Sequence, residues 1–168
     1  MATNMYLKLG PIAGESRAKE FENQIEVHSF SYNCSQSLSP VRSSGMHTQG
    51  RTNHGLFHFT KLFDSSSPVI CQYMWNGKTI EKDIEFTVVA KHGDDAKTLQ
   101  YLKLTLSNVV VASYSVNGGG DVPYEEVALN FGKISVAYLQ QKQEDGTAGG
   151  TVAATHDLIA EESSGETG

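Results

Sequence analysis

The sequence predicts a mainly β fold, in which antiparallel strands surround one core and a single short helix lies beside them. Two observations support this prediction. Apolar and polar residues alternate along a series of short segments, which is typical of strands that bury one face. Turns of a few residues separate most of these segments, and such short connections favour antiparallel pairing. Antiparallel strands around one core form either a sandwich or a closed barrel.

About eight segments fit the strand pattern. In one of them, Ile84, Phe86 and Val88 alternate with the polar residues Glu85 and Thr87. The expected strands span residues 5–9, 25–32, 56–62, 84–90, 101–106, 109–116, 124–131 and 133–140. Residues 151–159 fit one further strand at the edge of a sheet.

One segment carries the signals of a helix. Ser66 or Ser67 is suited to the N-cap position, and Pro68 follows at the first helical position, where its missing N–H costs little. Gly77 provides a C-terminal stop. The sequence therefore predicts a short helix of about two turns between these residues.

Two polar segments do not fit either pattern. Residues 35–55 form a long connection without an apolar period, and a loop of this length is usually functional or disordered. The chain of 168 residues has the size of one domain. We expect a single domain over residues 1–160 and a disordered tail over residues 161–168, which are poor in apolar side chains.

Charge and composition argue against several function classes. The formal net charge is −6, whereas a nucleic-acid binder would show a basic patch, so no nucleic-acid partner is expected. No stretch approaches the roughly 20 apolar residues of a membrane helix, and no signal peptide is recognisable at the N-terminus. We therefore expect a protein made in the cytoplasm, without membrane insertion. Its cysteines, Cys34 and Cys71, are expected to be free thiols.

The sequence shows no catalytic or metal-binding constellation. The six histidines lack the ligand spacing of common zinc sites, so no metal and no cofactor is expected. No G-x-S-x-G nucleophile motif is present. The Gly118–Gly120 triplet lacks the Lys-Ser or Lys-Thr of a phosphate loop, and we expect a hairpin turn there. These observations favour a binding or assembly protein over an enzyme.

A further signal comes from five segments and their order. They are MYLKLGPIAGES near the start, IEVHSFSYNCSQS, FHFTKLFDSSSPVI at the helix entry, LQYLKLTLSNVVVASYSV and EEVALNFGKISVAYLQQ. No single segment is specific, but the order and spacing of all five make a strong combination. Together they resemble the haemolysin-coregulated protein (Hcp) family over about residues 1–145, and more loosely to residue 158.

The resemblance implies a closed β-barrel, Hcp-like and phage tail-tube-like, with the helix on its side. Members of this family form hexameric rings that stack into the inner tube of the type VI secretion system. A contractile sheath expels the tube, a spike protein lies at its tip, and some members hold effector proteins in the ring lumen. The resemblance thus implies a non-enzymatic tube subunit, cytoplasmic before firing and then secreted.

The resemblance also implies candidate site residues. The strand that contains Phe30, Ser31 and Tyr32 is unusually rich in hydroxyl and amide groups. It is expected to line the lumen with Ser31 facing the effector, and the alternative is a strand with one solvated outer face. The long polar loop is expected to contact the next ring. Its candidate residues are Arg42, Ser43, Ser44, Met46, His47, Gln49 and Arg51.

Two other functions stay open at the level of sequence. A tail-tube subunit of a contractile phage-like particle would share the fold but not the cargo role. A small β-barrel enzyme or sugar-binding module would need titratable groups gathered in one pocket, and the sequence does not place such a group. Stable rings would separate both kinds of tube protein from this last class.

Overall fold

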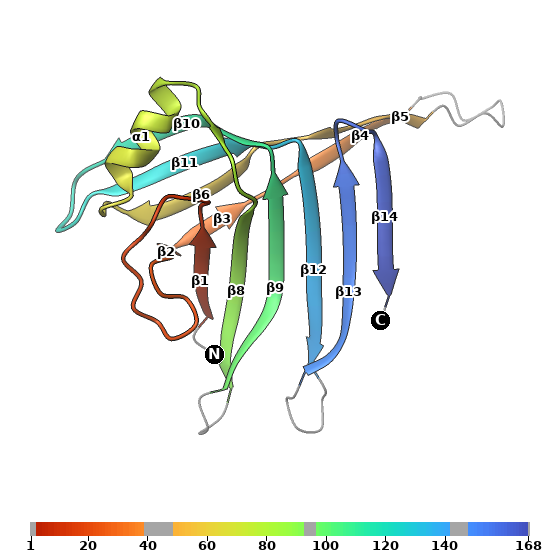
Figure 1. Ribbon diagram of the computed structural model, residues 1–168, viewed down its shortest axis with the longest axis horizontal. Coiled ribbons are helices and arrows are strands. Elements are labelled where there is room, and N and C mark those ends of the chain that lie inside the picture. Colours follow the sequence, from red (N-terminus) through yellow and green to blue (C-terminus); the bar gives the residue numbers. More distant parts are fainter. Residues whose placement is uncertain (1–2, 39–48, 93–96, 142–147, 168) are drawn as a thin grey trace.

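A computed structural model describes residues 3–38, 49–92, 97–141 and 148–167. The described chain is mainly β with one short helix, which confirms the predicted fold class (Figure 1). The elements are β1 (Thr3–Lys8), β2 (Ile25–Val27), β3 (Ser29–Ser31), β4 (Cys34–Leu38), β5 (Gln49–His54), β6 (Phe57–Leu62), α1 (Ser67–Trp75), β7 (Thr79–Ile80), β8 (Ile84–His92), β9 (Lys97–Ser107), β10 (Val109–Asn117), β11 (Tyr124–Asn130), β12 (Lys133–Gln141), β13 (Ala148–Asp157) and β14 (Glu162–Thr167).

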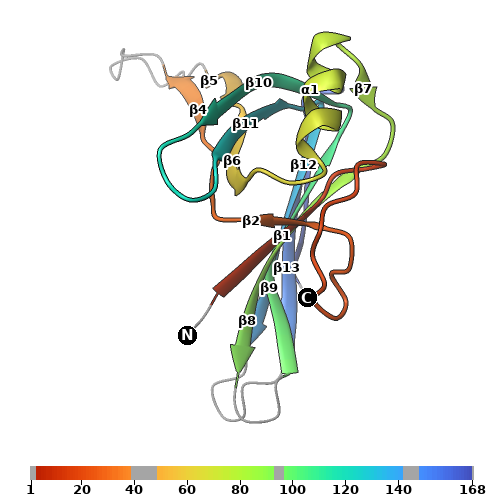
Figure 2. The ribbon, with the colours of Figure 1, turned by 90° about the vertical axis from the view of Figure 1, so that its left-hand side faces the viewer.

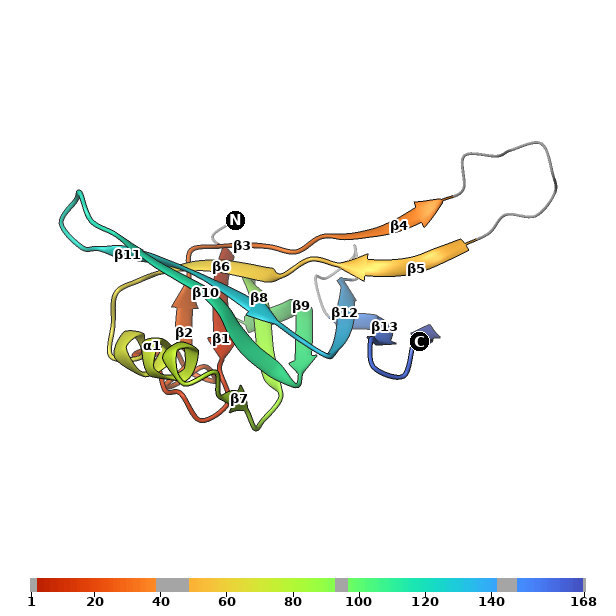
Figure 3. The same ribbon diagram turned by 90° about the horizontal axis from the view of Figure 1, so that it is seen from above.

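In the described ranges the strands form two large sheets and a separate two-stranded ribbon. The first sheet has the order β14-β13-β12-β9-β8-β1-β2, and the second has the order β3-β6-β11-β10-β7. Their pairings are antiparallel, as the short turns predict. Figure 2 shows the first sheet edge-on, with the second sheet and α1 at its upper end. The ribbon of β4 and β5 extends away from both sheets, past β12 and β13 (Figure 3). We call this ribbon the arm.

The hydrophobic core lies between the two sheets. Phe57 and Phe59 of β6 and Phe86 of β8 are fully buried, and the rings of Phe57 and Phe86 lie 5.3 Å apart. Leu106 of β9 and Leu129 of β11 belong to the same cluster. Because side chains alternate across a strand, each of these strands sends every second residue into the core. Burial of each such side chain stabilises the fold by about 1.5–3 kcal/mol.

The expected strand over residues 25–32 is in fact two strands. β2 pairs with β1 in the first sheet, whereas β3 pairs with β6 in the second. The chain changes sheets at His28, whose backbone N–H donates to the carbonyl oxygen of Thr60 at 2.8 Å. A bend of one residue therefore joins the sheets, and it places Ser31 on a different sheet from Ile25.

The expected closure into a continuous barrel is wrong for the described strands. β14 and β2 are the edges of the first sheet, and β3 and β7 are the edges of the second. Two sheets that pack face to face bury a core between them without a closed ring of backbone hydrogen bonds.

Two segments expected to lack regular structure contain strands instead. The long polar connection holds β4 and β5, and the expected disordered tail forms β14, which pairs with β13. The expected end of the domain at residue 160 falls inside the turn between β13 and β14. In this turn the carboxylate of Asp157 accepts hydrogen bonds at 2.9 Å from the backbone of Ile159 and Ala160. Composition underestimates such strands because backbone hydrogen bonds to a neighbour hold them, whatever their side chains.

Helix α1 starts and stops near the predicted residues. Ser66 occupies the N-cap position, although its side chain makes no cap hydrogen bond, and Pro68 lies in the first turn. The helix ends before Gly77, which has a φ of +57° and therefore a conformation that glycine adopts readily. Ile70 is buried beneath the helix, whereas Trp75 is 77% exposed at its end.

Candidate functional site

The predicted lumen residues of β3 differ in what they contact. Ser31 is exposed, and its backbone pairs with that of His58 on β6. Phe30 points to the other side, where its ring lies 4.6 Å from Phe86 and 6.2 Å from Phe57, and it is 36% exposed. Strand alternation explains this division, since neighbouring side chains face opposite sides. Ser31, like Ser29, therefore lies on the exposed side of β3, and Phe30 anchors the strand to the core.

A polar row crosses the exposed side of the second sheet beside Ser31. Ser29, Thr60 and Glu126 are paired across β3, β6 and β11, and paired residues share one face. The hydroxyls of Ser29 and Thr60 lie 2.7 Å apart. Nδ1 of His58 lies 3.7 Å from a carboxylate oxygen of Glu126. This solvated face is compatible with either a polar lumen wall or an outer surface.

Tyr32 leads from β3 into the arm and is half-buried. Its hydroxyl lies 2.5 Å from Nδ1 of His54, across the base of the arm. Burial raises the pKa of Tyr32 to about 12, and neighbouring Cys34 adds to the shift. The hydroxyl therefore stays protonated at neutral pH. Tyr32 therefore links the two strands of the arm through this hydrogen bond and is not a surface residue.

The backbones of Asn33 and Gly55 lie close together at the base of the arm. The N–H of Gly55 donates to the carbonyl oxygen of Asn33 at 2.8 Å. A Cβ atom at Gly55 would lie 1.9 Å from the side-chain oxygen of Asn33, so a larger residue would displace it. A larger residue at position 55 would therefore require the Asn33 side chain to change its rotamer.

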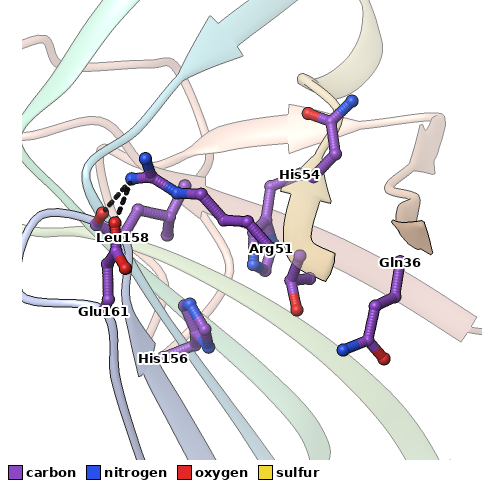
Figure 4. A pocket seen from close by; sticks show the side chains of 8 residues that line it. Gln36, Arg51, His54, His156, Leu158 and Glu161 are labelled. Carbon is purple, nitrogen blue, oxygen red and sulfur yellow. Dashed lines mark hydrogen bonds and ion pairs between the residues drawn. The ribbon is translucent and has the colours of Figure 1, made fainter. Parts of the chain in front are cut away.

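A cavity of about 670 Å³ lies between the arm and the C-terminal hairpin formed by β13 and β14 (Figure 4). The guanidinium of Arg51 on β5 pairs with the Glu161 carboxylate at 3.1 Å and donates to the carbonyl oxygen of Leu158 at 3.2 Å. Both acceptors belong to the turn of the hairpin. The lining residues are Gln36, Arg51, Thr52, Asn53, His54, His156, Leu158 and Glu161.

Two histidines meet at this cavity. The rings of His54 on β5 and His156 on β13 lie 4.9 Å apart. Nδ1 of His156 lies 2.9 Å from the hydroxyl of Ser163, and Nε2 of His54 is buried without a hydrogen-bond partner in the described ranges. Burial lowers the pKa of His54, and the proximity of His156 lowers it further. The neutral imidazole is therefore the form that this site favours.

A buried ionic network anchors α1 to the second sheet. The ammonium of Lys61, which is fully buried, donates to Asp64 at 2.8 Å and to the hydroxyl of Ser67 at 3.1 Å. It also lies 3.2 Å from Oε2 of buried Glu125, an ion pair in which that oxygen accepts no hydrogen bond. Tyr114 donates to the other carboxylate oxygen of Glu125 at 3.0 Å. The network satisfies its charges internally, so its role is structural.

The predicted ring-contact residues fall mostly outside the described residues. Five of them belong to residues 39–48, which the structure does not describe: Arg42, Ser43, Ser44, Met46 and His47. Gln49 begins β5, and Arg51 holds the arm to the C-terminal hairpin.

Sequence reasoning missed the meeting of His54 and His156 and the pairing of Lys61 with Glu125. The residues of each pair lie far apart in the chain, so spacing carries no signal of them. Within the described ranges, no group of three or more metal-ligating side chains could hold an ion, and Cys34 and Cys71 are free. No described helix has the length and apolarity to cross a bilayer.

Comparisons with known proteins agree with one family. The family model "Type VI secretion system effector, Hcp" matches residues 6–138. The hcp1 protein of Pseudomonas aeruginosa is 34% identical over 154 residues, which cover 90% of this chain and 93% of that protein. The crystal structure of Hcp1 from Salmonella typhimurium is 28% identical, with a TM-score of 0.78, and the match covers 98% of this chain and 100% of the other.

Two further solved structures support the fold. A type VI secretion system effector from Yersinia pestis is 25% identical with a TM-score of 0.71, over 91% of this chain and 98% of its own. A type six secretion system protein has a TM-score of 0.87 at 23% identity, over 97% of this chain and 100% of its own, a likeness of fold alone. The chain therefore belongs to the Hcp family, and this confirms its predicted role as a structural tube subunit of the type VI secretion system.

Proposed function

We propose that the protein works as a homohexameric ring, that rings stack into the tube, and that the lumen binds effector proteins weakly. The arm is the observation that carries this proposal. β4 and β5 extend away from both sheets, and an isolated two-stranded ribbon is marginally stable in water. The arm therefore gains stability when a neighbouring subunit covers it. A head-to-tail contact between two different faces of each subunit closes into a ring.

Ring stacking is assigned to the same part of the chain. Contacts through the polar residues between β4 and β5 would be weak and reversible, which suits a tube that assembles and is then expelled. The residues proposed for these contacts are Arg42, Ser43, Ser44, Met46, His47, Gln49 and Arg51. Arg51 would then serve two roles, because its guanidinium also contacts Glu161 within the chain.

The mass of the purified protein tests the ring directly. Light scattering after size exclusion is expected to give a species of about six chains, since one heterologous contact repeated around a closed ring fixes the copy number. A monomer at micromolar concentration would count against the ring in solution. A filament of variable length would instead indicate that rings stack without other components.

Effector binding is assigned to the exposed side of β3. Ser31 faces solvent there, while Phe30 and Tyr32 hold the strand by packing and by the hydrogen bond to His54. A small hydroxyl on a solvated face suits weak contact with many proteins, because it offers one donor and two acceptor positions. The alternative, a solvated outer surface, predicts no effect of Ser31 on cargo.

The Ser31→Gln variant separates these two alternatives. The longer amide is expected to obstruct the lumen and weaken effector co-purification by about tenfold or more, equivalent to about 1.4 kcal/mol. The mass of the ring should stay the same, because Ser31 lies outside the core. Ser65→Gln, at an exposed serine beside the helix entry, is the matched control and should retain effectors. Equal retention by both variants would remove Ser31 from the cargo site.

The proposal extends to the other components of the secretion system. We assign the side of the ring that carries α1 to the contractile sheath, because this helix exposes Trp75 and Val69. A spike protein would cap the end of the stacked rings. The protein would be cytoplasmic before firing and extracellular afterwards, exported by the machine rather than by a signal peptide. None of these roles uses catalysis, so the protein is proposed not to be an enzyme.

A further inference from the structure

Between described residues, two kinds of contact link the arm to the C-terminal hairpin. One is charged: Arg51 pairs with Glu161 at 3.1 Å, with both side chains well exposed. The other is a contact between imidazole rings, with His54 and His156 at 4.9 Å. The arm otherwise points away from the sheets (Figure 3). The rings of Tyr32 and His54 also lie 6.0 Å and 6.1 Å from that of Phe131 and fix the base of the arm, so the contacts at the cavity set its direction relative to the C-terminal hairpin.

We propose that this group is an acid-sensitive latch, in which protonation of His54 and His156 releases the arm from the C-terminal hairpin. Nδ1 of His54 forms a hydrogen bond with the Tyr32 hydroxyl, and Nδ1 of His156 forms one with the Ser163 hydroxyl. Two imidazolium rings at this separation would repel each other across the partly buried contact. The exposed pair of Arg51 and Glu161 is worth at most about 1 kcal/mol, too little to hold the arm against that repulsion.

Among the described residues, one carboxylate acts on the pair of rings, because Asp157 interacts electrostatically with His156. The Glu161 carboxylate is paired with Arg51, and Asp157 accepts hydrogen bonds from the backbone of its own turn. Lys133 on β12 acts on the same Asp157 carboxylate and offsets part of its negative charge. From the arm side the facing groups are the neutral Tyr32 hydroxyl and the Cys34 thiol beside it. Among the described residues, neither imidazole has a hydrogen-bonded carboxylate that would stabilise its charged form.

The direction of the pH response follows from the environment of His54. Its pKa is lowered in the docked arm, by burial first and then by His156, so the docked state binds fewer protons than the released state. Docking is therefore fully favourable above the ordinary histidine pKa of about 6.5 and weakens as the pH falls below it. If one proton is bound on release, the equilibrium constant for docking of the arm falls by up to about tenfold for each pH unit of acidification.

The latch has a consequence for assembly, and this part rests on the proposed function. If the arm is the segment that reaches a neighbouring subunit, a released arm presents its end in many directions. Each ring contact must then also offset the entropy of ordering the arm. Rings should therefore be weaker in mild acid than at neutral pH, whereas the movement of the arm within one chain does not depend on rings at all.

A distance measurement between the arm and the hairpin tests the latch. Nitroxide labels at Ser37→Cys and Ser164→Cys, in a Cys34→Ser, Cys71→Ser background, report the distance between β4 and β14. Labelled chains are diluted into excess unlabelled protein, so that only pairs within one chain are read. We expect one narrow distribution at about pH 7.5 and a longer, broader one at about pH 5. An unchanged distribution would overturn the proposal.

Three variants at histidines sharpen the test. His156→Lys places a permanent cation beside His54 and should give the broad distribution at both pH values. His156→Gln removes the second charge but leaves His54 buried, so its acid response should be clearly smaller than that of the parent. His58→Gln changes a histidine on β6 that pairs with Glu126, and it should respond as the parent does. A full acid response in His156→Gln, or none in His58→Gln, would contradict the latch.

Light scattering on the same samples separates the latch from the ring. Arm release at about pH 5 together with loss of the hexamer would support both ideas. Arm release with no ring at either pH would retain the latch and contradict the proposed assembly. A stable hexamer whose arm distance ignores pH would retain the assembly and overturn the latch.

Discussion

The Lys61→Met variant is expected to lower the free energy of unfolding by about 3–5 kcal/mol. Methionine fills a similar volume but removes the ammonium, so the buried carboxylate of Glu125 loses its ionic partner. Asp64 and Ser67 lose a hydrogen-bond donor at the same time, and these two residues hold the start of α1. Urea denaturation followed by circular dichroism measures the loss, at one protein concentration for all variants because assembly would couple to stability.

Two comparisons make this prediction specific to the buried network. Lys103→Met removes a pair with Glu85 at 3.0 Å in which both side chains are partly exposed, and it should cost at most about 1 kcal/mol. The double variant Lys61→Met, Glu125→Gln should regain part of the loss, because the fully buried charge of Glu125 is removed together with that of its partner. Equal losses in the two single lysine variants would mean that burial does not set the strength of the network.

The Phe57→Ala variant is expected to lower the free energy of unfolding by about 3–5 kcal/mol as well, but for a different reason. Phe57 is fully buried, and its ring contacts Phe30, Phe59 and Phe86 from three strands. Truncation leaves a cavity at the point where the two sheets meet. The same urea titration measures the effect, and the loss of packing beneath Phe30 should also loosen β3.

Phe63→Ala is the matched control for this variant. Phe63 directly follows β6 and is 46% exposed, so its truncation should change stability by about 0.5 kcal/mol or less. A comparable loss in both variants would show that Phe63 is covered by another subunit in solution. A small loss in Phe57→Ala would show that the core around it collapses to fill the cavity.

The strands that form the core could be predicted from the sequence. In β6 and β8 the apolar residues alternate regularly, and the structure buries Phe57, Phe59 and Phe86 as that alternation predicts. The helix was equally readable, because Pro68 and Gly77 act locally on the backbone. Five motifs in order also identified the family, although none of them was specific alone.

The strands at the edges could not be predicted in the same way. β4, β5 and β14 are rich in Ser, Gly, Asn and Gln, residues that composition assigns to loops or disorder. What makes β14 a strand is the row of backbone groups that β13 offers to it. The division of residues 25–32 at His28 has the same origin, since the position of Thr60 on another strand decides it.

The sequence by itself determined the β class, the place of the helix, the core strands and the family, because alternation, capping and motif order are local properties of the chain. Only the tertiary structure decided that His54 meets His156 beneath the arm and that Lys61 and Glu125 share one buried network. These contacts join residues from different strands, so their chemistry depends on distances that no spacing along the chain encodes. Burial then assigns their charge states, because the cost of a charge depends on the solvent that the fold removes.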